Sequence, residues 1–134
     1  MDSEVFEFET GKRRFIDLTD TVRRYCAKRG DGLCHVFVPH ATAGLALIEL
    51  GSGSEDDLDR LIDTILPRDD RYRHRHGSVG HGADHVVPAI VSPSLVLAVL
   101  AGVVALGTWQ SVVLVDTNPD NPRRQVRLSF LGDP

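Results

Sequence analysis

The last third of the chain places the strongest constraint on the fold. Short apolar runs, rich in valine and leucine, follow one another there, and Pro, Gly, Asn and Asp residues separate them. This pattern is typical of strands joined by turns. The runs lie at 86–91, 94–100, 103–106, 109–116 and 125–130.

The first two thirds of the chain add two helices to further strands. Residues 20–29 follow a capping threonine and end at Gly30, which predicts a helix. A second helix is predicted to begin at Ser54 and to end before Pro67, because its apolar residues recur every three or four positions. These apolar residues are Leu58, Leu61, Ile62 and Ile65. Strands are expected at 4–9, 13–18, 33–38 and 41–50. The order of elements predicts a single α+β domain over residues 1–134, built mainly on antiparallel sheets.

Charge and apolar content argue against several functional classes. The chain of 134 residues has 15 Lys and Arg against 19 Asp and Glu, and this net charge of -4 gives no general attraction to nucleic acid or anionic membranes. The longest apolar region, 95–106, is about 12 residues long, whereas a bilayer span needs about 20. Cys26 and Cys34 form no CxxC pair, which favours free thiols inside the cell. We therefore expect a cytoplasmic protein that binds neither nucleic acid nor membranes.

The six histidines are distributed unevenly along the chain. His40 follows the proline that ends a predicted strand, whereas His35 lies inside that strand and is expected to make a local hydrogen bond. The other four lie in or just after the polar loop 68–83, at His74, His76, His81 and His85. Within this group, residues 80–85 hold two imidazoles and a carboxylate, which are donors that suit Zn²⁺. The spacing leaves three interpretations open, namely metal binding, a structural polar loop, and acid–base catalysis without a metal.

Several other polar residues lie near the ends of apolar runs. Asp116 ends a buried strand, which is typical of either a turn or a ligand. Arg124 follows the next turn, where a guanidinium can clamp a phosphate, although solvated arginines are as common. Trp109 is the only tryptophan and is expected in the core, while Gln110 beside it points to the opposite face. Glu49 ends an apolar run, so burial can leave it facing a pocket.

Taken together, these motifs resemble the YjbQ family. The resemblance rests on the order of three segments, which are PHATAG at 39–44, the Asp-His pair at 84–85 and GTWQ at 107–110. It also includes Val36–Val38, Glu49, Asp57–Leu58, Leu66–Pro67, Tyr72–His74 and Pro93–Ser94. The similarity therefore covers nearly the whole chain.

The resemblance implies an antiparallel β-sandwich with two flanking helices, assembled as a homotrimer. Members are commonly named secondary thiamine-phosphate synthase enzymes, and the implied reaction joins a pyrimidine diphosphate to a thiazole phosphate and releases pyrophosphate. We expect a transferase of this type, with a phosphorylated small-molecule substrate and a divalent metal such as Zn²⁺ or Mg²⁺. Two alternatives remain: a metal-dependent hydrolase or lyase acting on another phosphorylated metabolite, and a non-catalytic trimeric binding protein.

The resemblance and the histidine-rich loop together lead to one expected pocket at subunit contacts. The expected catalytic residues are His40, Glu49, His85 and Gln110. The expected substrate-binding residues are Thr42, Gly44, Arg73, Trp109 and Arg124. The expected metal ligands are His40, His81, Asp84 and His85. Two segments depart from the family pattern: residues 50–53 read Leu-Gly-Ser-Gly instead of Asn-Ala-Asp-Pro, and residues 80–82 read Gly-His-Gly instead of Gly-Asn.

Overall fold

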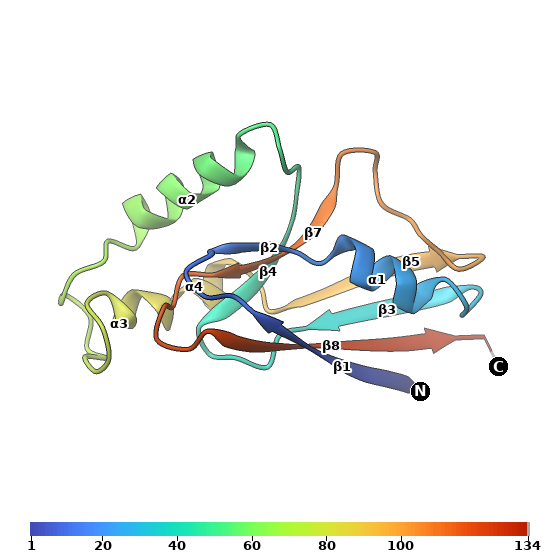
Figure 1. Ribbon diagram of the computed structural model, residues 1–134, viewed down its shortest axis with the longest axis horizontal. Coiled ribbons are helices and arrows are strands. Elements are labelled where there is room, and N and C mark those ends of the chain that lie inside the picture. The colour runs from blue at the N-terminus through green and yellow to red at the C-terminus, as the bar shows by residue number, and fades with distance from the viewer. Residues whose placement is uncertain (134) are drawn as a thin grey trace.

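Two antiparallel sheets form the body of the protein (Figure 1). The computed structural model describes residues 1–133. Its strands are β1 (Asp2–Glu9), β2 (Phe15–Asp17), β3 (Gly32–Phe37), β4 (Ala43–Ile48), β5 (Ser94–Leu100), β6 (Val103–Val104), β7 (Ser111–Asp116) and β8 (Arg123–Gly132). The larger sheet has the order β1-β8-β3-β5-β6, and the smaller has the order β2-β7-β4. All of these strand pairs are antiparallel, which confirms the predicted α+β class.

The core lies between the two sheets and the helix α1 (Thr19–Cys26). Alternate residues of a strand point to opposite faces, and in β3 the inward residues Cys34 and Val36 are fully buried. They belong to one hydrophobic cluster with Val112 and Leu114 of β7 and with Val22 of α1. Both sheets and the helix therefore share a single apolar interior.

The second predicted helix, α2 (Ser54–Ile65), is present but only partly covered. One side of α2 packs in a second hydrophobic cluster, in which Ile62 joins Val115 of β7 and Ala46 of β4. Ile62 is buried, whereas Leu61 and Ile65 are 54% and 47% exposed. None of the helices within residues 1–133 has the length and apolar character needed to cross a bilayer.

Two short helices lie where the sequence predicted a loop and a strand. They are α3 (His81–Asp84) and α4 (Val87–Ile90), so the strand prediction for 86–91 was wrong. A short apolar run does not distinguish a strand from a buried helical turn, and Pro88 fits the first turn of α4 because that position needs no N–H donor. The core prediction for Trp109 was also wrong, since it lies in the turn before β7 and is 72% exposed.

These short helices pack against one end of the smaller sheet. The pairing of β4 with β7 places Ala43 opposite Asp116 at this end. The segment after α4 approaches so closely that Leu45 N–H donates to the Ser92 carbonyl over 2.8 Å, and a Cβ at Gly44 would clash with the Val91 carbonyl oxygen. Figure 1 shows α3 and α4 on the side of the molecule opposite to the two chain termini.

Candidate functional site

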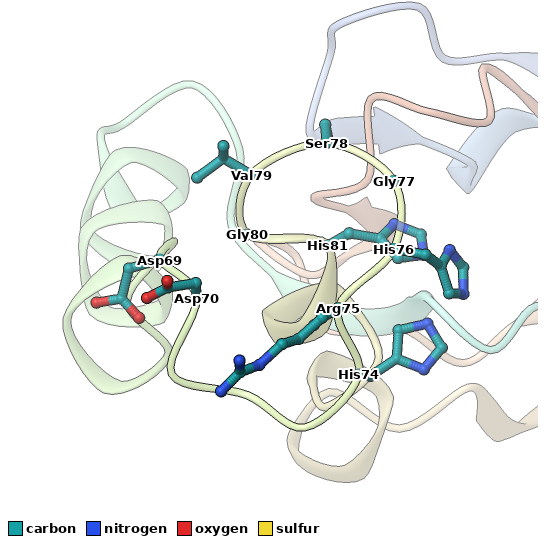
Figure 2. Close-up of a pocket in the computed structure, with 11 residues that line it drawn as sticks. Asp69, Asp70, His74, Arg75, His76, Gly77, Ser78, Val79, Gly80 and His81 are labelled. Atoms are coloured by element: carbon teal, nitrogen blue, oxygen red, sulfur yellow. The ribbon is translucent and has the colours of Figure 1, made fainter.

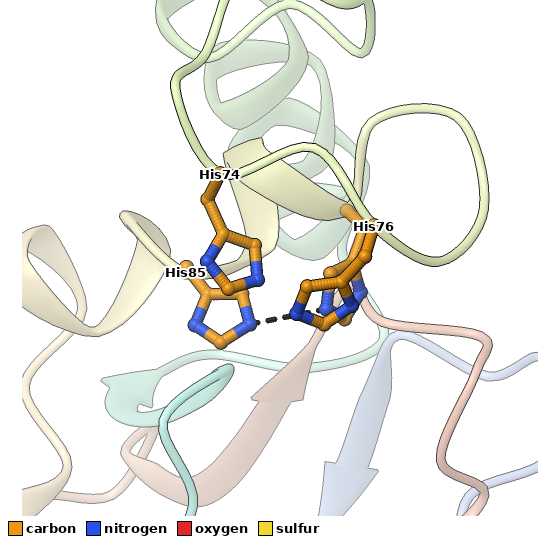
Figure 3. A group of neighbouring side chains, drawn as sticks. His74, His76 and His85 are labelled. Atoms are coloured by element: carbon orange, nitrogen blue, oxygen red, sulfur yellow. Dashed lines mark hydrogen bonds between the residues drawn. The ribbon is translucent and has the colours of Figure 1, made fainter.

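Four histidine rings converge beside α3 (Figure 3). His74 and His76 come from the loop before α3, His81 is the first residue of α3, and His85 follows it. One nitrogen from each ring lies within 4.8 Å of the others. His81 Nε2 and His85 Nε2 are 3.0 Å apart, and the rings of His74 and His85 have centroids 3.8 Å apart. We call these four residues the histidine cluster.

The local backbone explains why the rings meet. His81 and His85 are four residues apart on one helical turn, and residues at this spacing share a face. The loop carrying His74 and His76 curls around α3 (Figure 2). Gly80, which directly precedes α3, has φ of +86°, a left-handed conformation that favours glycine. This turn brings the loop back over the helix.

Two rings of the histidine cluster, His74 and His85, lie where the neutral imidazole is favoured. Burial lowers the pKa of His85, and the neighbouring imidazoles lower it further. Burial and the charges of His76 and His81 also lower the pKa of His74. Both rings therefore stay unprotonated at neutral pH, which is the form that binds a metal ion.

The donor set fits Zn²⁺ better than Mg²⁺. Imidazole nitrogen is a ligand for Zn²⁺, Cu²⁺, Ni²⁺ and Fe²⁺, whereas Mg²⁺ requires oxygen donors. Nitrogens bound to one tetrahedral Zn²⁺ at about 2.0–2.1 Å would lie about 3.3–3.4 Å apart. The 3.0 Å separation of His81 Nε2 and His85 Nε2 is close to that value.

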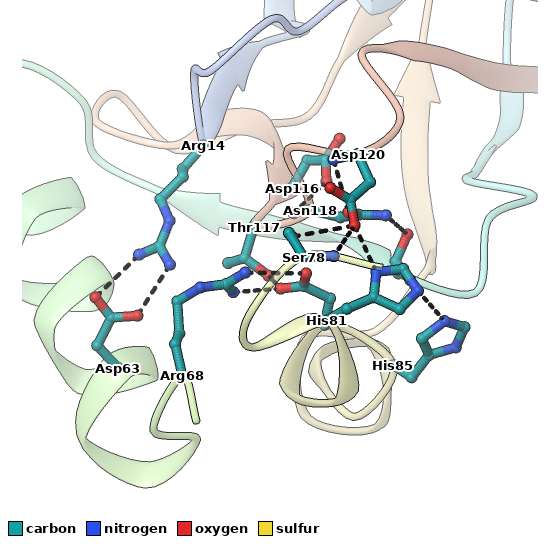
Figure 4. Close-up of polar contacts among 12 residues, drawn as sticks. Arg14, Asp63, Arg68, Ser78, His81, His85, Asp116, Thr117, Asn118 and Asp120 are labelled. Atoms are coloured by element: carbon teal, nitrogen blue, oxygen red, sulfur yellow. Dashed lines mark hydrogen bonds and ion pairs between the residues drawn. The ribbon is translucent and has the colours of Figure 1, made fainter. Parts of the chain in front are cut away.

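Asp84, a predicted metal ligand, is committed to other partners, namely Arg68 and Thr117, which Figure 4 labels. Its carboxylate accepts two hydrogen bonds from the Arg68 guanidinium and one, of 2.6 Å, from Thr117 Oγ1. The side chain is fully buried. Asp84 therefore ties α3 to the base of the loop and to the end of β7, and it leaves the histidine cluster to imidazole donors.

His40 and His85 line the same cavity, whose volume is about 580 Å³. Of the histidine cluster, His76 and His81 also line this cavity. Gln125 N–H donates to His40 Nε2 over 2.8 Å. Burial and the Arg124 charge lower the pKa of His40, so the ring is neutral and its proton lies on Nδ1. His40 thus has a hydrogen-bond donor at Nδ1, and it lies outside the histidine cluster.

Arg124 and Thr42 form part of a buried network in the wall of the cavity. Arg124 donates to both carboxylate oxygens of Asp116, over 2.6 and 3.0 Å, and to Thr42 Oγ1 over 2.7 Å. Asn118 Nδ2 also donates to Thr42 Oγ1. The guanidinium is therefore neutralised by a carboxylate, which competes with the expected contact to a substrate phosphate.

The remaining predicted site residues lie elsewhere in the chain. Glu49 follows β4 and Gln110 precedes β7, at the end of the smaller sheet about 20 Å from Thr42 by strand length. Gly107 N–H donates to Gln110 Oε1, and Ser52 Oγ donates to Glu49 Oε1. Arg73 is exposed on the loop and does not line the cavity.

Sequence reasoning missed three residues of this site. His74 and His76 were recognised as histidines of the loop but were not included among the expected ligands. Asp120, in the turn after β7, was not considered, although its Oδ2 lies 3.2 Å from His81 Nδ1. The signal available in the sequence was the density of histidines between 74 and 85, whereas nothing in the sequence places Asp120 beside them.

The fold and the cavity define a small α+β protein with a histidine-lined site, and comparison with known proteins gives the family. A family model described as UPF0047 protein YjbQ-like matches residues 4–133. The chain belongs to this YjbQ-like family. A UPF0047 protein of Mycobacterium tuberculosis is 61% identical over 131 residues, which are 98% of each chain. A UPF0047 protein of Archaeoglobus fulgidus is 32% identical and covers 88% of this chain and 93% of its own.

Solved structures agree with the fold. A hypothetical protein from Aeropyrum pernix K1 is 30% identical, with a TM-score of 0.88 over 99% of this chain and 100% of that chain. A YbjQ-like protein of unknown function from Sulfolobus solfataricus P2 is 23% identical, with a TM-score of 0.90 over 98% of this chain and 97% of that chain. At that identity, the second likeness concerns the fold alone.

Proposed function

We propose that the chain is a metal-dependent enzyme that acts on a phosphorylated small molecule in the cavity between His40 and the histidine cluster. The observation that carries the proposal is the convergence of four imidazoles, three of which (His76, His81 and His85) line this cavity. The reaction implied by the family resemblance joins a pyrimidine diphosphate to a thiazole phosphate. The bond to the diphosphate breaks, and the leaving pyrophosphate takes the electron pair and gains negative charge.

The residues of the cavity suit a reaction in which a phosphate oxygen gains charge. A divalent ion held by the imidazoles would stabilise that charge. His40 would donate from Nδ1 to the same oxygen or to a neighbouring one, because Gln125 N–H occupies its Nε2. A donor placed at a developing oxyanion contributes about 10²–10³-fold in rate.

A hydrolase or lyase acting on a substrate with one phosphate is the second candidate. The observation that favours it is the shortage of free positive charge in the cavity. Among residues 1–133, the one arginine that lines the cavity is Arg124, which is paired with Asp116. A single phosphate could be bound by the metal alone, whereas the condensation must hold three phosphoryl groups.

We also propose the homotrimer that the resemblance implies. The outer face of the larger sheet supports an oligomer, because it presents a group of exposed apolar side chains from four adjacent strands. These are Leu33, Val96, Leu100, Val103 and Leu131.

The enzymatic proposal predicts Zn²⁺-dependent turnover of a phosphorylated substrate. Activity is expected to disappear in EDTA and to return with Zn²⁺, in a screen that compares the two-substrate condensation with single phosphate esters. His40→Ala is expected to lower kcat/KM by about 10²-fold, because it removes one donor to the developing charge. Zn²⁺ affinity should be unchanged in this variant, since His40 lies outside the histidine cluster. Zn²⁺-loaded protein that turns over none of these substrates would contradict the proposal and favour a non-catalytic binding protein.

The oligomer predicts a specific response to a charge on the outer face. Val96→Asp is expected to change the mass measured by light scattering from three chains to one, because Val96 is 62% exposed and pairs with β3 at the middle of this face. Val79→Asp is the control, since Val79 is equally apolar and 78% exposed but lies in the loop. An unmodified protein with the mass of one chain would contradict the trimer.

A further inference from the structure

The buried nitrogen of His81 has an unusual environment. The side chain is 9% exposed, and Nδ1 makes no hydrogen bond of good geometry with any atom of residues 1–133. A carboxylate oxygen, Asp120 Oδ2, nevertheless lies 3.2 Å from it, as Figure 4 shows. The other nitrogen of the ring, Nε2, is directed to His85 Nε2 within the histidine cluster. His81 therefore connects the cluster to a carboxylate on the turn between β7 and β8.

Asp120 is itself held in place on the His81 side. Ser78 donates to the same oxygen, Oδ2, from its backbone N–H over 2.9 Å and from Oγ over 3.0 Å. The backbone N–H of Asp120 donates to Asn118 Oδ1 over 2.9 Å. The Ser78 hydrogen bonds therefore hold Oδ2 of this carboxylate beside the His81 ring.

The backbone beside this pair leaves no room for another side chain. A Cβ at Gly77 would lie 2.6 Å from Asp120 Oδ2 and 3.0 Å from His81 Cγ. Gly77 has φ of +79°, so both its conformation and its surroundings require glycine. The loop thus approaches the carboxylate and the imidazole as closely as its backbone permits.

We infer that Asp120 is a positioning residue of a transition-metal site formed by the histidine cluster, and that it orients His81 as a ligand of Zn²⁺ class ions. This inference rests on the proposed function. An imidazole that binds a metal through Nε2 carries its proton on Nδ1, and that proton needs an acceptor when it is buried. Asp120 Oδ2 is the acceptor at hand, since it lies 3.2 Å from Nδ1. A carboxylate behind the imidazole also makes Nε2 a stronger donor.

The contacts also suggest a merely structural role, in which Asp120 only anchors the loop through Ser78. The two roles differ in how they depend on His81. A positioning residue acts through the ring that it orients, so its effect on metal affinity must disappear when the ring is absent. An anchor of the loop would affect His74 and His76 as well, and its effect would persist without His81.

The test is a double-mutant cycle on Zn²⁺ affinity, measured on the full chain by competition with a chromophoric chelator. Asp120→Ala is expected to weaken binding by about 10–100-fold, and Asp120→Asn, which keeps an acceptor, should recover part of this loss. In the His81→Ala background, Asp120→Ala should cause no further loss. Ser78→Ala is the matched control, because it removes one hydrogen bond to the same oxygen without affecting His81 directly, and it should cause a smaller loss than Asp120→Ala.

Each contrary result has a distinct meaning. Unchanged affinity in Asp120→Ala would overturn the inference while leaving the metal site intact. An undiminished effect of Asp120→Ala in the His81→Ala background would also overturn it and would assign the carboxylate to loop anchoring. Unmodified protein that binds neither Zn²⁺ nor Co²⁺ would overturn both this inference and the proposed metal-dependent function. Far-ultraviolet circular dichroism of every variant verifies that the fold is retained.

Discussion

Replacement of Arg124 by alanine is expected to lower the free energy of unfolding by about 3–5 kcal/mol. The guanidinium is 2% exposed and makes two hydrogen bonds to Asp116, whose side chain is 1% exposed. Without Arg124, the Asp116 carboxylate keeps the hydrogen bond from Asn118 N–H but loses its counter-ion in a buried position. The free energy of unfolding of a native protein is about 5–15 kcal/mol. This one substitution is therefore expected to remove a large fraction of the stability.

Urea denaturation of two further variants separates the causes of this loss. Arg123→Ala is the matched control, because the neighbouring Arg123 is 81% exposed and forms a surface ion pair with Glu9; its effect should stay below about 1 kcal/mol. A double variant with Arg124→Met and Asp116→Leu removes both charges of this pair and should lose less than Arg124→Ala. If Arg124→Ala costs less than about 1 kcal/mol, the guanidinium is not a structural ion-pair partner and the expected role in phosphate binding regains support.

Most helices and strands could be predicted from the spacing of apolar residues, because this spacing shows which side chains are buried. The run that became β3 alternates buried and less buried residues, and α2 was recognised from its helical spacing of apolar residues. The prediction was wrong where burial alone does not determine the backbone. The run 86–91 packs against β4 as a helical turn, which a short apolar segment permits equally well. The exposure of Trp109 is likewise a property of the turn before β7, not of the residue type.

The candidate site was less predictable because it depends on contacts between distant segments. The density of histidines identified the loop. Asp84 was predicted as a metal ligand in place of His74 and His76 because it is closer in the sequence to His81 and His85. In the structure, Asp84 turns toward Arg68 and Thr117, since a buried carboxylate needs a counter-ion and hydrogen bonds. Asp120 is 39 residues from His81 in the sequence, and only the turn between β7 and β8 brings the two together.

Replacement of His85 by alanine is expected to weaken Zn²⁺ binding by more than about 100-fold. Loss of a residue that only supports a metal ligand typically weakens binding by up to about 100-fold. His85 is central to the histidine cluster, because its Nε2 is 3.0 Å from His81 Nε2 and its ring centroid is 3.8 Å from that of His74. The substitution removes one of the four proposed ligands, whereas the fold of the metal-free protein should change little, since His85 is only half-buried.

The difference in Zn²⁺ affinity between the His85→Ala variant and the unmodified protein is measurable as stabilisation of the fold by added Zn²⁺. At a concentration 100 times the Kd of the unmodified protein, binding stabilises the folded state by about 2.7 kcal/mol, while a site weakened 100-fold gains only about 0.4 kcal/mol. His35→Ala is the matched control, because His35 lies on β3, where its Nε2 is 2.6 Å from Ser94 Oγ, outside the histidine cluster. It should retain the full Zn²⁺-dependent stabilisation. Equal stabilisation of His85→Ala and His35→Ala would mean that the ion binds elsewhere, and the convergence of the four rings would then reflect loop packing alone.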